Sequence, residues 1–150
     1  MVFLDNELFQ VDSVAFNRQA AEILRKGTAR DQGAEMLRLY RGRFAPEFEY
    51  EEWADDWRTQ LHGEYLHLAH TTVAVLVRSG QLAQAVDVLI LVTATDPLAF
   101  DLRATLISCL AALGSTDAAQ SHYKSLATLH VRDLGVPARS YEEIVKEIPP

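Results

Sequence analysis

The chain has little cysteine, no long apolar run and no basic N-terminal segment. Its single cysteine, Cys109, cannot form an intramolecular disulfide, which fits a reducing compartment. The longest apolar stretch, VDVLILVTA, is too short to cross a bilayer and carries Asp87. The N-terminus, MVFLDNELFQ, lacks the positive charge of a secretory signal. We therefore expect a cytoplasmic protein that is neither exported nor anchored in a membrane.

Positive charge is also scarce. Fourteen Lys and Arg residues stand against 21 Asp and Glu residues, so the formal net charge is −7 at pH 7. Such a chain repels phosphate, which argues against broad electrostatic attraction to nucleic acid or anionic membranes and favours basic partners. Hydrophobic residues nevertheless make up 49% of the 150 residues, enough for the core of one domain.

Glycine and proline are sparse, at seven and five residues, and they fall where apolar periods of 3.6 residues end. The pattern predicts an all-α fold of about seven helices. A first helix is expected from Ser13 to Gly27, a second one closed by Gly42, and a third one over 50–79, with Gly63 as its weak point.

Two later segments, SGQLAQAVDVLILVTATDP and LGSTDAAQSHYKSLATLHV, superpose at an offset of 34 residues. In a helix-turn-helix repeat, a glycine permits the tight turn and an alanine lets the second helix approach the first closely. The spacing resembles the tetratricopeptide repeat, and it predicts helical hairpins that curve into a right-handed superhelix with a concave groove. The aligned pairs are Leu76 and Leu110, Gly80 and Gly114, Ala85 and Ala119, and Leu89 and Tyr123.

Two capping signals complete the helical pattern. We expect Asp96 to be the N-cap of the next helix and Pro97 to occupy its first position, where a missing amide proton costs nothing. A last helix fits RSYEEIVKEI, in which Ser140 and Glu143 have the spacing of a capping box.

Several motifs in a fixed order carry a family resemblance: LYRGRFAPEFEYEEWADDWRTQL, the TDPL junction, LAALGSTDAAQSHYKSL and LGVPARSYE. Together they resemble the bacterial transcriptional activator domain. That domain looks like the middle part of the Streptomyces antibiotic regulatory protein family, where it follows a winged-helix DNA-binding domain. The resemblance covers about residues 13–146, so residues 13–150 are assigned to the activator domain. Residues 1–12 are expected to form an extended arm, similar to the end of such a winged helix.

The resemblance implies an all-helical, tetratricopeptide-like regulatory module for dimerisation or for contacts with signal inputs and the transcription machinery. It implies no catalytic residues and no cofactor. The DNA-reading helix is absent from these 150 residues, so direct DNA binding by this chain alone is not expected. A sensor domain that binds a small-molecule effector and a freestanding adaptor are the alternatives.

Four residues are candidates for partner binding: Arg41, Arg43, Trp53 and Trp57. Tryptophan and arginine are enriched among residues that dominate binding energy at interfaces. Trp53 and Trp57 lie four residues apart, so they share a helix face, and the alternative is that this face packs on the preceding helices. The arginines resemble a nucleic-acid patch, but the six carboxylates that follow favour internal ion pairs.

The remaining chemically active side chains favour ordinary structural roles. His67 and His70 share a helix face, but nothing nearby completes a metal site. Cys109 lies on an apolar stripe and is expected to be buried and inert. The chain has neither the G-x-S-x-G motif nor the phosphate-binding loop. We therefore expect no enzymatic activity and no metal site.

Overall fold

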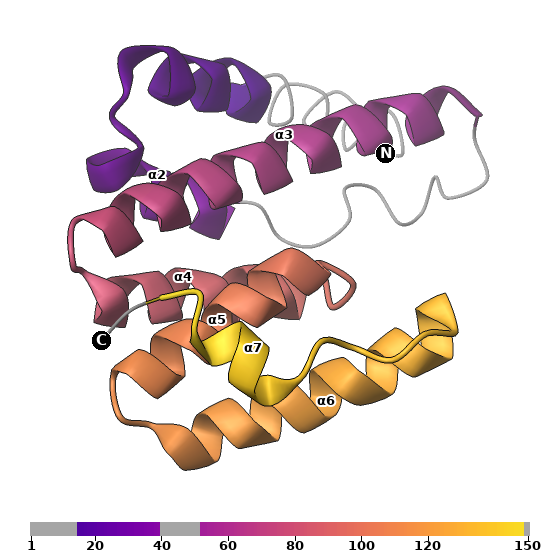
Figure 1. The fold of residues 1–150 in the computed structure, drawn as a ribbon. Coiled ribbons are helices and arrows are strands. Elements are labelled where there is room, and N and C mark those ends of the chain that lie inside the picture. Colours follow the sequence, from indigo (N-terminus) through magenta and orange to yellow (C-terminus); the bar gives the residue numbers. More distant parts are fainter. Residues whose placement is uncertain (1–14, 40–51, 149–150) are drawn as a thin grey trace. The chain divides into compact units, whose positions relative to one another are not determined.

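The computed structural model describes residues 15–39 and 52–148, apart from the side chains of Leu39, residues 52–55, Trp57 and Arg58 (Figure 1). Seven helices and no strand run through these residues, which confirms the predicted all-α fold. The expected arm of residues 1–12 and the closing Gly42 lie outside them. The helices are 15–26, α2 (Ala29–Leu39), α3 (Glu52–Arg78), α4 (Leu82–Thr95), α5 (Phe100–Ala112), α6 (Thr116–Leu134) and α7 (Tyr141–Val145).

The chain divides into two compact units, Met1–Val75 and Leu76–Pro150. In the first unit, the described helices bury apolar residues three or four positions apart, as amphipathic helices do. The helix α3 continues through Gly63 without a break, so the predicted weak point does not interrupt it. Among the described residues of this unit, the buried apolar ones are Phe16, Ala20, Ile23, Ala29, Met36, Leu37, Leu61, Tyr65, Leu68, Ala69 and Val73.

Two glycines shape the first unit. Gly27 ends the helix 15–26 as predicted, and its φ of +70° is a conformation that side chains with a Cβ rarely adopt. Gly33 lies in the middle of α2 where that helix approaches α3 closely. A Cβ at Gly33 would overlap with Oγ1 of Thr72 and lie 3.0 Å from the Cβ of Thr72. This glycine therefore sets how near α2 and α3 can pack.

The second unit confirms the 34-residue repeat in its backbone hydrogen bonds. The amide of Gln81 donates to the carbonyl oxygen of Leu76 at 2.9 Å, and the amide of Ser115 donates to Leu110 at 2.9 Å. Both turns place a glycine at positive φ, +75° and +81°. Ala85 on α4 and Ala119 on α6, each in the helix that follows the turn, are fully buried. The fold is thus a tetratricopeptide-like helical repeat, whereas the right-handed superhelix stays a prediction.

The junction at Asp96 differs from the prediction. The helix α5 begins at Phe100, so Pro97 does not occupy its first position, and the N-cap residue is Ala99. Asp96 instead follows the end of α4 in an extended conformation, and its Oδ1 accepts a hydrogen bond from the amide of Leu98 at 3.0 Å. The side chain therefore closes a turn between α4 and α5, because a carboxylate can bond an amide two residues on as readily as a helix terminus.

The short helix α7 is fixed against the second repeat. Ser140 and Glu143 form the predicted capping box, with both reciprocal hydrogen bonds present. α5 contacts α4, α6 and α7. Tyr123 on α6 donates a hydrogen bond to the carbonyl oxygen of Arg139 at 2.9 Å, and its ring meets that of Tyr141 edge-on at 5.7 Å. The C-terminal segment therefore packs on the α5–α6 hairpin.

Candidate functional site

The side chains of the four residues predicted to bind a partner lie outside the described part of the chain. Arg41 and Arg43 lie outside the described residues. The backbone of Trp53 and Trp57 lies at the start of α3, but their side chains are outside the described part of the chain. The choice between packing and partner binding for these tryptophans therefore stays a prediction.

The histidines of α3 are spread over its surface. His67 and His70 are exposed, whereas the ring of His62 stacks on Tyr65 with their centroids 6.3 Å apart. Among residues 15–39 and 52–148, no group of three or more His, Cys, Asp or Glu side chains is placed to hold a metal ion.

Cys109 is fully buried in α5, as its apolar stripe predicts. Burial raises the pKa of its thiol from 9.0 to about 11, because a thiolate would lose its hydration there. The neutral thiol is a poor nucleophile and a poor metal ligand. Cys109 therefore serves as a small core residue.

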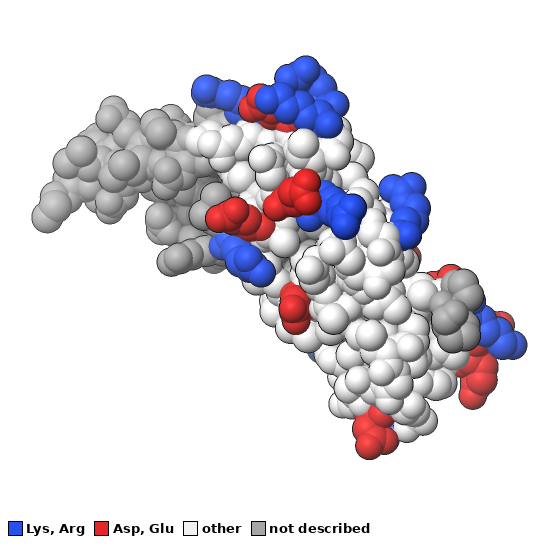
Figure 2. All heavy atoms as spheres, turned by 90° about the vertical axis from the view of Figure 1, so that its left-hand side faces the viewer, with Lys and Arg blue, Asp and Glu red and all other residues white. Residues whose placement is uncertain are grey.

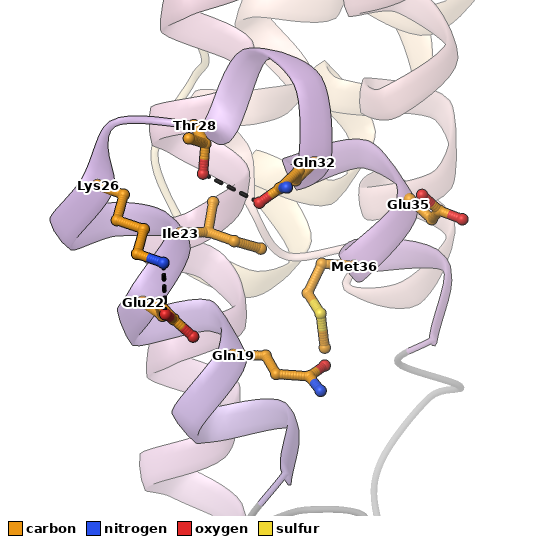
Figure 3. A pocket seen from close by; sticks show the side chains of 8 residues that line it. All are labelled: Gln19, Glu22, Ile23, Lys26, Thr28, Gln32, Glu35 and Met36. Carbon is orange, nitrogen blue, oxygen red and sulfur yellow. Dashed lines mark hydrogen bonds and ion pairs between the residues drawn. The ribbon is translucent and has the colours of Figure 1, made fainter.

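The first unit contains an open pocket of about 610 Å³, which we call the hairpin pocket. It lies between the helix 15–26 and α2, on either side of the turn at Gly27 (Figure 3). Ile23 and Met36 point into the gap from opposite helices, and each is 7% exposed. The remaining lining residues are Gln19, Glu22, Lys26, Thr28, Gln32 and Glu35.

Polar contacts hold two parts of the rim of the hairpin pocket. Lys26 Nζ lies 2.7 Å from Oε1 of Glu22, one helical turn earlier, and this pair lowers the pKa of Glu22. Thr28 Oγ1 donates to Oε1 of Gln32 at 3.0 Å across the first turn of α2. Ile23 and Met36 are buried beneath these contacts, so the hairpin pocket presents mainly polar groups to solvent.

Charged side chains gather over the turn beside the hairpin pocket. Arg25, Lys26 and Arg30 are exposed on both sides of Gly27, and Glu22 is exposed one turn earlier. Figure 2 shows Lys, Arg, Asp and Glu side chains together at this end of the first unit. The surface around the pocket thus has both signs of charge, although the whole chain is acidic.

Sequence reasoning did not identify the hairpin pocket as a site. Ile23 and Met36 are apolar positions of their helices, but the polar residues around them look like an ordinary solvated helix face. Gln19, Glu22 and Lys26 follow one helix at spacings of three and four, and Glu35 and Met36 lie three and four residues after Gln32, but any amphipathic helix has such spacings, so they do not mark a pocket.

The second unit exposes large apolar side chains at the end of α6. Val131 and Leu134 are 57% and 52% exposed, and Val136 follows just after the helix. Nearby, the ring of His130 lies 5.2 Å from that of Phe100, and its Nδ1 lies 3.0 Å from the carbonyl oxygen of Val136. Large contiguous apolar patches mark interaction sites, whereas scattered exposed apolar side chains are ordinary on protein surfaces.

Comparisons with known proteins give one family. A family model described as the bacterial transcriptional activator domain matches residues 4–146. No curated protein matches the chain. None of the helices in the described ranges is long and apolar enough to span a membrane.

Proposed function

The chain belongs to the bacterial transcriptional activator domain family, and from this premise we propose that it is the regulatory, protein-interaction and oligomerisation module of a bacterial transcriptional activator. The family match over residues 4–146 is the observation that carries the proposal. The module acts by presenting a rigid helical surface to another protein or to a second copy of itself, in the cytoplasm.

Two structural features support a binding role. Helical repeats hold their surface side chains on a rigid scaffold, so binding a partner costs little conformational entropy in ordering the chain. The second unit also leaves apolar side chains exposed, Val131 and Leu134 at the end of α6. Apolar groups bordered by polar residues are the usual anatomy of a protein interface.

A small-molecule effector is the second candidate, and the volume of the hairpin pocket favours it. A volume of about 610 Å³ falls in the range of drug-sized ligand sites. The lining of the pocket does not favour a small-molecule ligand. Drug-sized ligand sites are mostly apolar and enclose their ligand, whereas six of the eight lining residues here are polar. A protein partner therefore remains the leading proposal.

We also propose that the chain has no catalytic activity and does not bind DNA by itself. The buried Cys109, with a thiol pKa of about 11, offers no nucleophile near neutral pH. The net charge of −7 opposes contact with phosphate groups.

The test joins the chain to a DNA-binding domain that occupies its operator only as a dimer, with that operator placed upstream of a reporter promoter. We expect the fusion to change reporter output, either by self-association or by recruiting the transcription machinery. Light scattering on the isolated chain then separates these two routes. A fusion carrying Leu106→Asp, which places a charge in the core of the second unit, is the unfolded control. A folded, monomeric chain whose fusion leaves the reporter unchanged contradicts the proposal.

The same assay tests the predicted tryptophans. If Trp53→Ala and Trp57→Ala fold and lose the reporter response, these side chains contact the partner. If both variants unfold, packing is their role and the partner surface lies elsewhere. Circular dichroism distinguishes the two outcomes, since the chain is helical.

A further inference from the structure

We propose that two copies of the chain exchange their C-terminal helices, so that α7 of each copy packs on the α5–α6 hairpin of the other. The exchanged part is residues 139–148, which we call the docking segment. The hinge is residues 135–138, which we call the return linker. This inference rests on the self-association route of the proposed function, and it adds which element joins the two copies and what controls the joining.

The docking segment holds its own local shape. Its capping box joins Ser140 and Glu143, and Arg139 forms an ion pair with Glu147. Both contacts lie within the segment, so they move with it. A helix of five residues is nevertheless too short to be stable in water by itself, and α7 therefore depends on the surface that it packs on.

The α5–α6 hairpin provides that surface. Ile144 is buried, and its carbonyl oxygen accepts a hydrogen bond from Ser108 on α5. Tyr123 on α6 donates a hydrogen bond to the carbonyl oxygen of Arg139, and its ring meets that of Tyr141 edge-on. Each of these contacts joins the docking segment to α5 or α6 without involving the return linker. The docking segment of a second copy can therefore make all of them in the same geometry.

The return linker has almost no slack. It carries the chain from Leu134 back along α6 to the place where Tyr123 binds Arg139 (Figure 1). Leu134 lies 11 positions after Tyr123, a rise of roughly 16 Å along α6. Helical side chains lean toward the N-terminus, so the ring of Tyr123 does not shorten this path. From Leu134 to Arg139 the chain spans roughly 18 Å at most, so it reaches the docking site of its own copy only when nearly extended.

The backbone of the return linker also suits a hinge. Proline fixes its own φ, and Pro137 therefore favours an extended conformation for itself and for Val136. The reversal at the end of α6 depends on Gly135, whose φ is +69°. Glycine changes its backbone conformation at little cost, so the hinge can open there without disturbing α6. Short hinges with little slack favour exchange between copies.

Apolar side chains surround the hinge. Val131 and Leu134 lie one helical turn apart at the end of α6, Val136 follows in the return linker, and all three are more than half exposed. Exchange makes the two linkers cross between the copies and brings these side chains together. Three side chains cover far less than the roughly 800 Å² that each partner buries in a standard interface, so they would support only a weak side-by-side dimer. Exchange needs less new surface, because the docking contacts of the closed chain are kept.

Linker length is the first test. Light scattering measures the molar mass of the full chain from about 10 μM to about 1 mM, and we expect the wild type to become increasingly dimeric over this range. Inserting Gly-Ser-Gly after Ala138 gives the linker slack and should weaken dimerisation roughly tenfold, because the segment then reaches its own docking site easily. Deleting Pro137 and Ala138 puts that site out of reach and should give a dimer throughout. Circular dichroism confirms that each variant is folded.

The apolar side chains at the hinge are tested separately. Leu134→Ser should weaken the dimer about three- to tenfold, because it removes an apolar group that exchange covers and leaves the docking contacts intact. Ile90→Ser is the matched control, since Ile90 is an exposed aliphatic residue on α4, and it should leave dimerisation unchanged.

Crosslinking distinguishes exchange from side-by-side contact. One copy carries Tyr123→Cys and the other Tyr141→Cys, both with Cys109→Ala, so only the new thiols react with a short bis-maleimide. The closed and exchanged forms lose the same ring contact, so these substitutions leave their balance unchanged. After the two variants are refolded together from urea, we expect a covalent dimer of mixed copies. The doubly substituted chain is the positive control, because its thiols face each other within one closed copy.

Three results would overturn the proposal. One is a wild type that stays monomeric at about 1 mM. Another is dimerisation that does not respond to linker length, which would place the interface elsewhere. The third is the absence of a mixed covalent dimer although the doubly substituted chain crosslinks internally. A monomeric chain whose fusion changes reporter output would refute this inference alone, and a linker-dependent dimer whose fusion leaves the reporter unchanged would refute only the proposed function.

Discussion

The hydroxyl of Ser108 on α5 lies 2.6 Å from the carbonyl oxygen of Ile144 on α7, and both residues are buried. The same hydroxyl lies 3.1 Å from the carbonyl oxygen of Ala104 in its own helix. A serine has one proton to donate, and the shorter distance indicates that it goes to Ile144. This hydrogen bond joins residues 36 positions apart and satisfies a backbone acceptor at the end of α7.

Replacing Ser108 by alanine should therefore destabilise the second unit. The variant removes one donor to the carbonyl oxygen of Ile144, which still accepts from the amide of Glu147 at 3.2 Å, so the loss should be that of one hydrogen bond, about 0.5–1.5 kcal/mol of unfolding free energy. Urea unfolding followed by circular dichroism measures the loss. Ser121→Ala, on the exposed face of α6, is the matched control and should change the unfolding free energy by less than about 0.5 kcal/mol. Equal effects of the two substitutions would show that α7 does not depend on this hydrogen bond.

Much of the fold follows from local sequence patterns. The 34-residue offset predicts both the turns at Gly80 and Gly114 and the buried Ala85 and Ala119, because each residue has a steric role that depends only on its own repeat. The capping box at Ser140 is likewise a local signal. The prediction for the junction at Asp96 was wrong. A carboxylate that can cap a helix can equally close the turn before that helix, and the sequence alone does not show which of the two it does.

The site was less predictable than the fold, for a physical reason. Whether a polar helix face is solvated or lines a pocket depends on the angle between two helices, and no periodicity in either helix encodes that angle. Gln19 and Glu35 therefore gave no signal of their own. The hydrogen bond from Ser108 to Ile144 could not be predicted from the sequence either, because it depends on how α7 packs on α5.

The contact between Gly33 and Thr72 gives a second prediction. Alanine is normally the better helix former, by about 1 kcal/mol, but at Gly33 its Cβ would overlap with Oγ1 of Thr72. We expect Gly33→Ala to lower the unfolding free energy by about 1–3 kcal/mol, since α2 must move away from α3. Urea unfolding checks the sign.

Two further variants test the cause of that effect. Gly63→Ala in α3, where an added Cβ meets nothing within 4 Å, should stabilise the chain by about 0.5–1 kcal/mol. Adding Thr72→Ala to Gly33→Ala removes Oγ1 and should recover part of the loss, because that hydroxyl is buried and has no hydrogen-bond partner among the described residues. A loss at Gly33 that Thr72→Ala leaves unchanged would point to another contact.

The thiol of Cys109 provides a third prediction. Its pKa is raised from 9.0 to about 11 by burial, so the folded chain favours the protonated thiol. The stability that this burial confers is fully present below pH 9 and is lost as pH rises through about 11, where the unfolded chain has already released the proton. The unfolding free energy of the wild type should fall more steeply over this interval than that of Cys109→Ala.

Alkylation by iodoacetamide tests the burial of the Cys109 thiol by an independent method. At pH 8 the thiol should react only when the chain opens, so labelling should be slow in buffer and fast in urea. Mass spectrometry follows the single modified residue, since the chain has one cysteine. Rapid labelling of the folded chain at pH 8 would contradict the buried position of Cys109.

The last prediction concerns His122 on α6. Burial lowers its pKa below the ordinary value of 6.5, and the guanidinium of Arg103 on α5 lowers it further. Arg103 is held in place by a hydrogen bond from its Nε to the carbonyl oxygen of Pro97 at 2.6 Å. The folded chain favours neutral His122, so its contribution to stability is present above pH 6.5 and is lost as pH falls through the lowered pKa. His122→Gln should therefore flatten the acid side of the stability profile.

Replacing Arg103 by glutamine removes the smaller of the two causes, so the pKa of His122 should rise part of the way toward 6.5 while burial keeps it below that value. The chemical shift of the His122 ring proton, followed by NMR across the acid range, measures this directly. Arg132→Gln is the matched control, because Arg132 is an exposed arginine on the same helix as His122 and is paired with Asp133. If the two arginine variants move the His122 pKa equally, the shift reflects overall charge rather than the contact between α5 and α6.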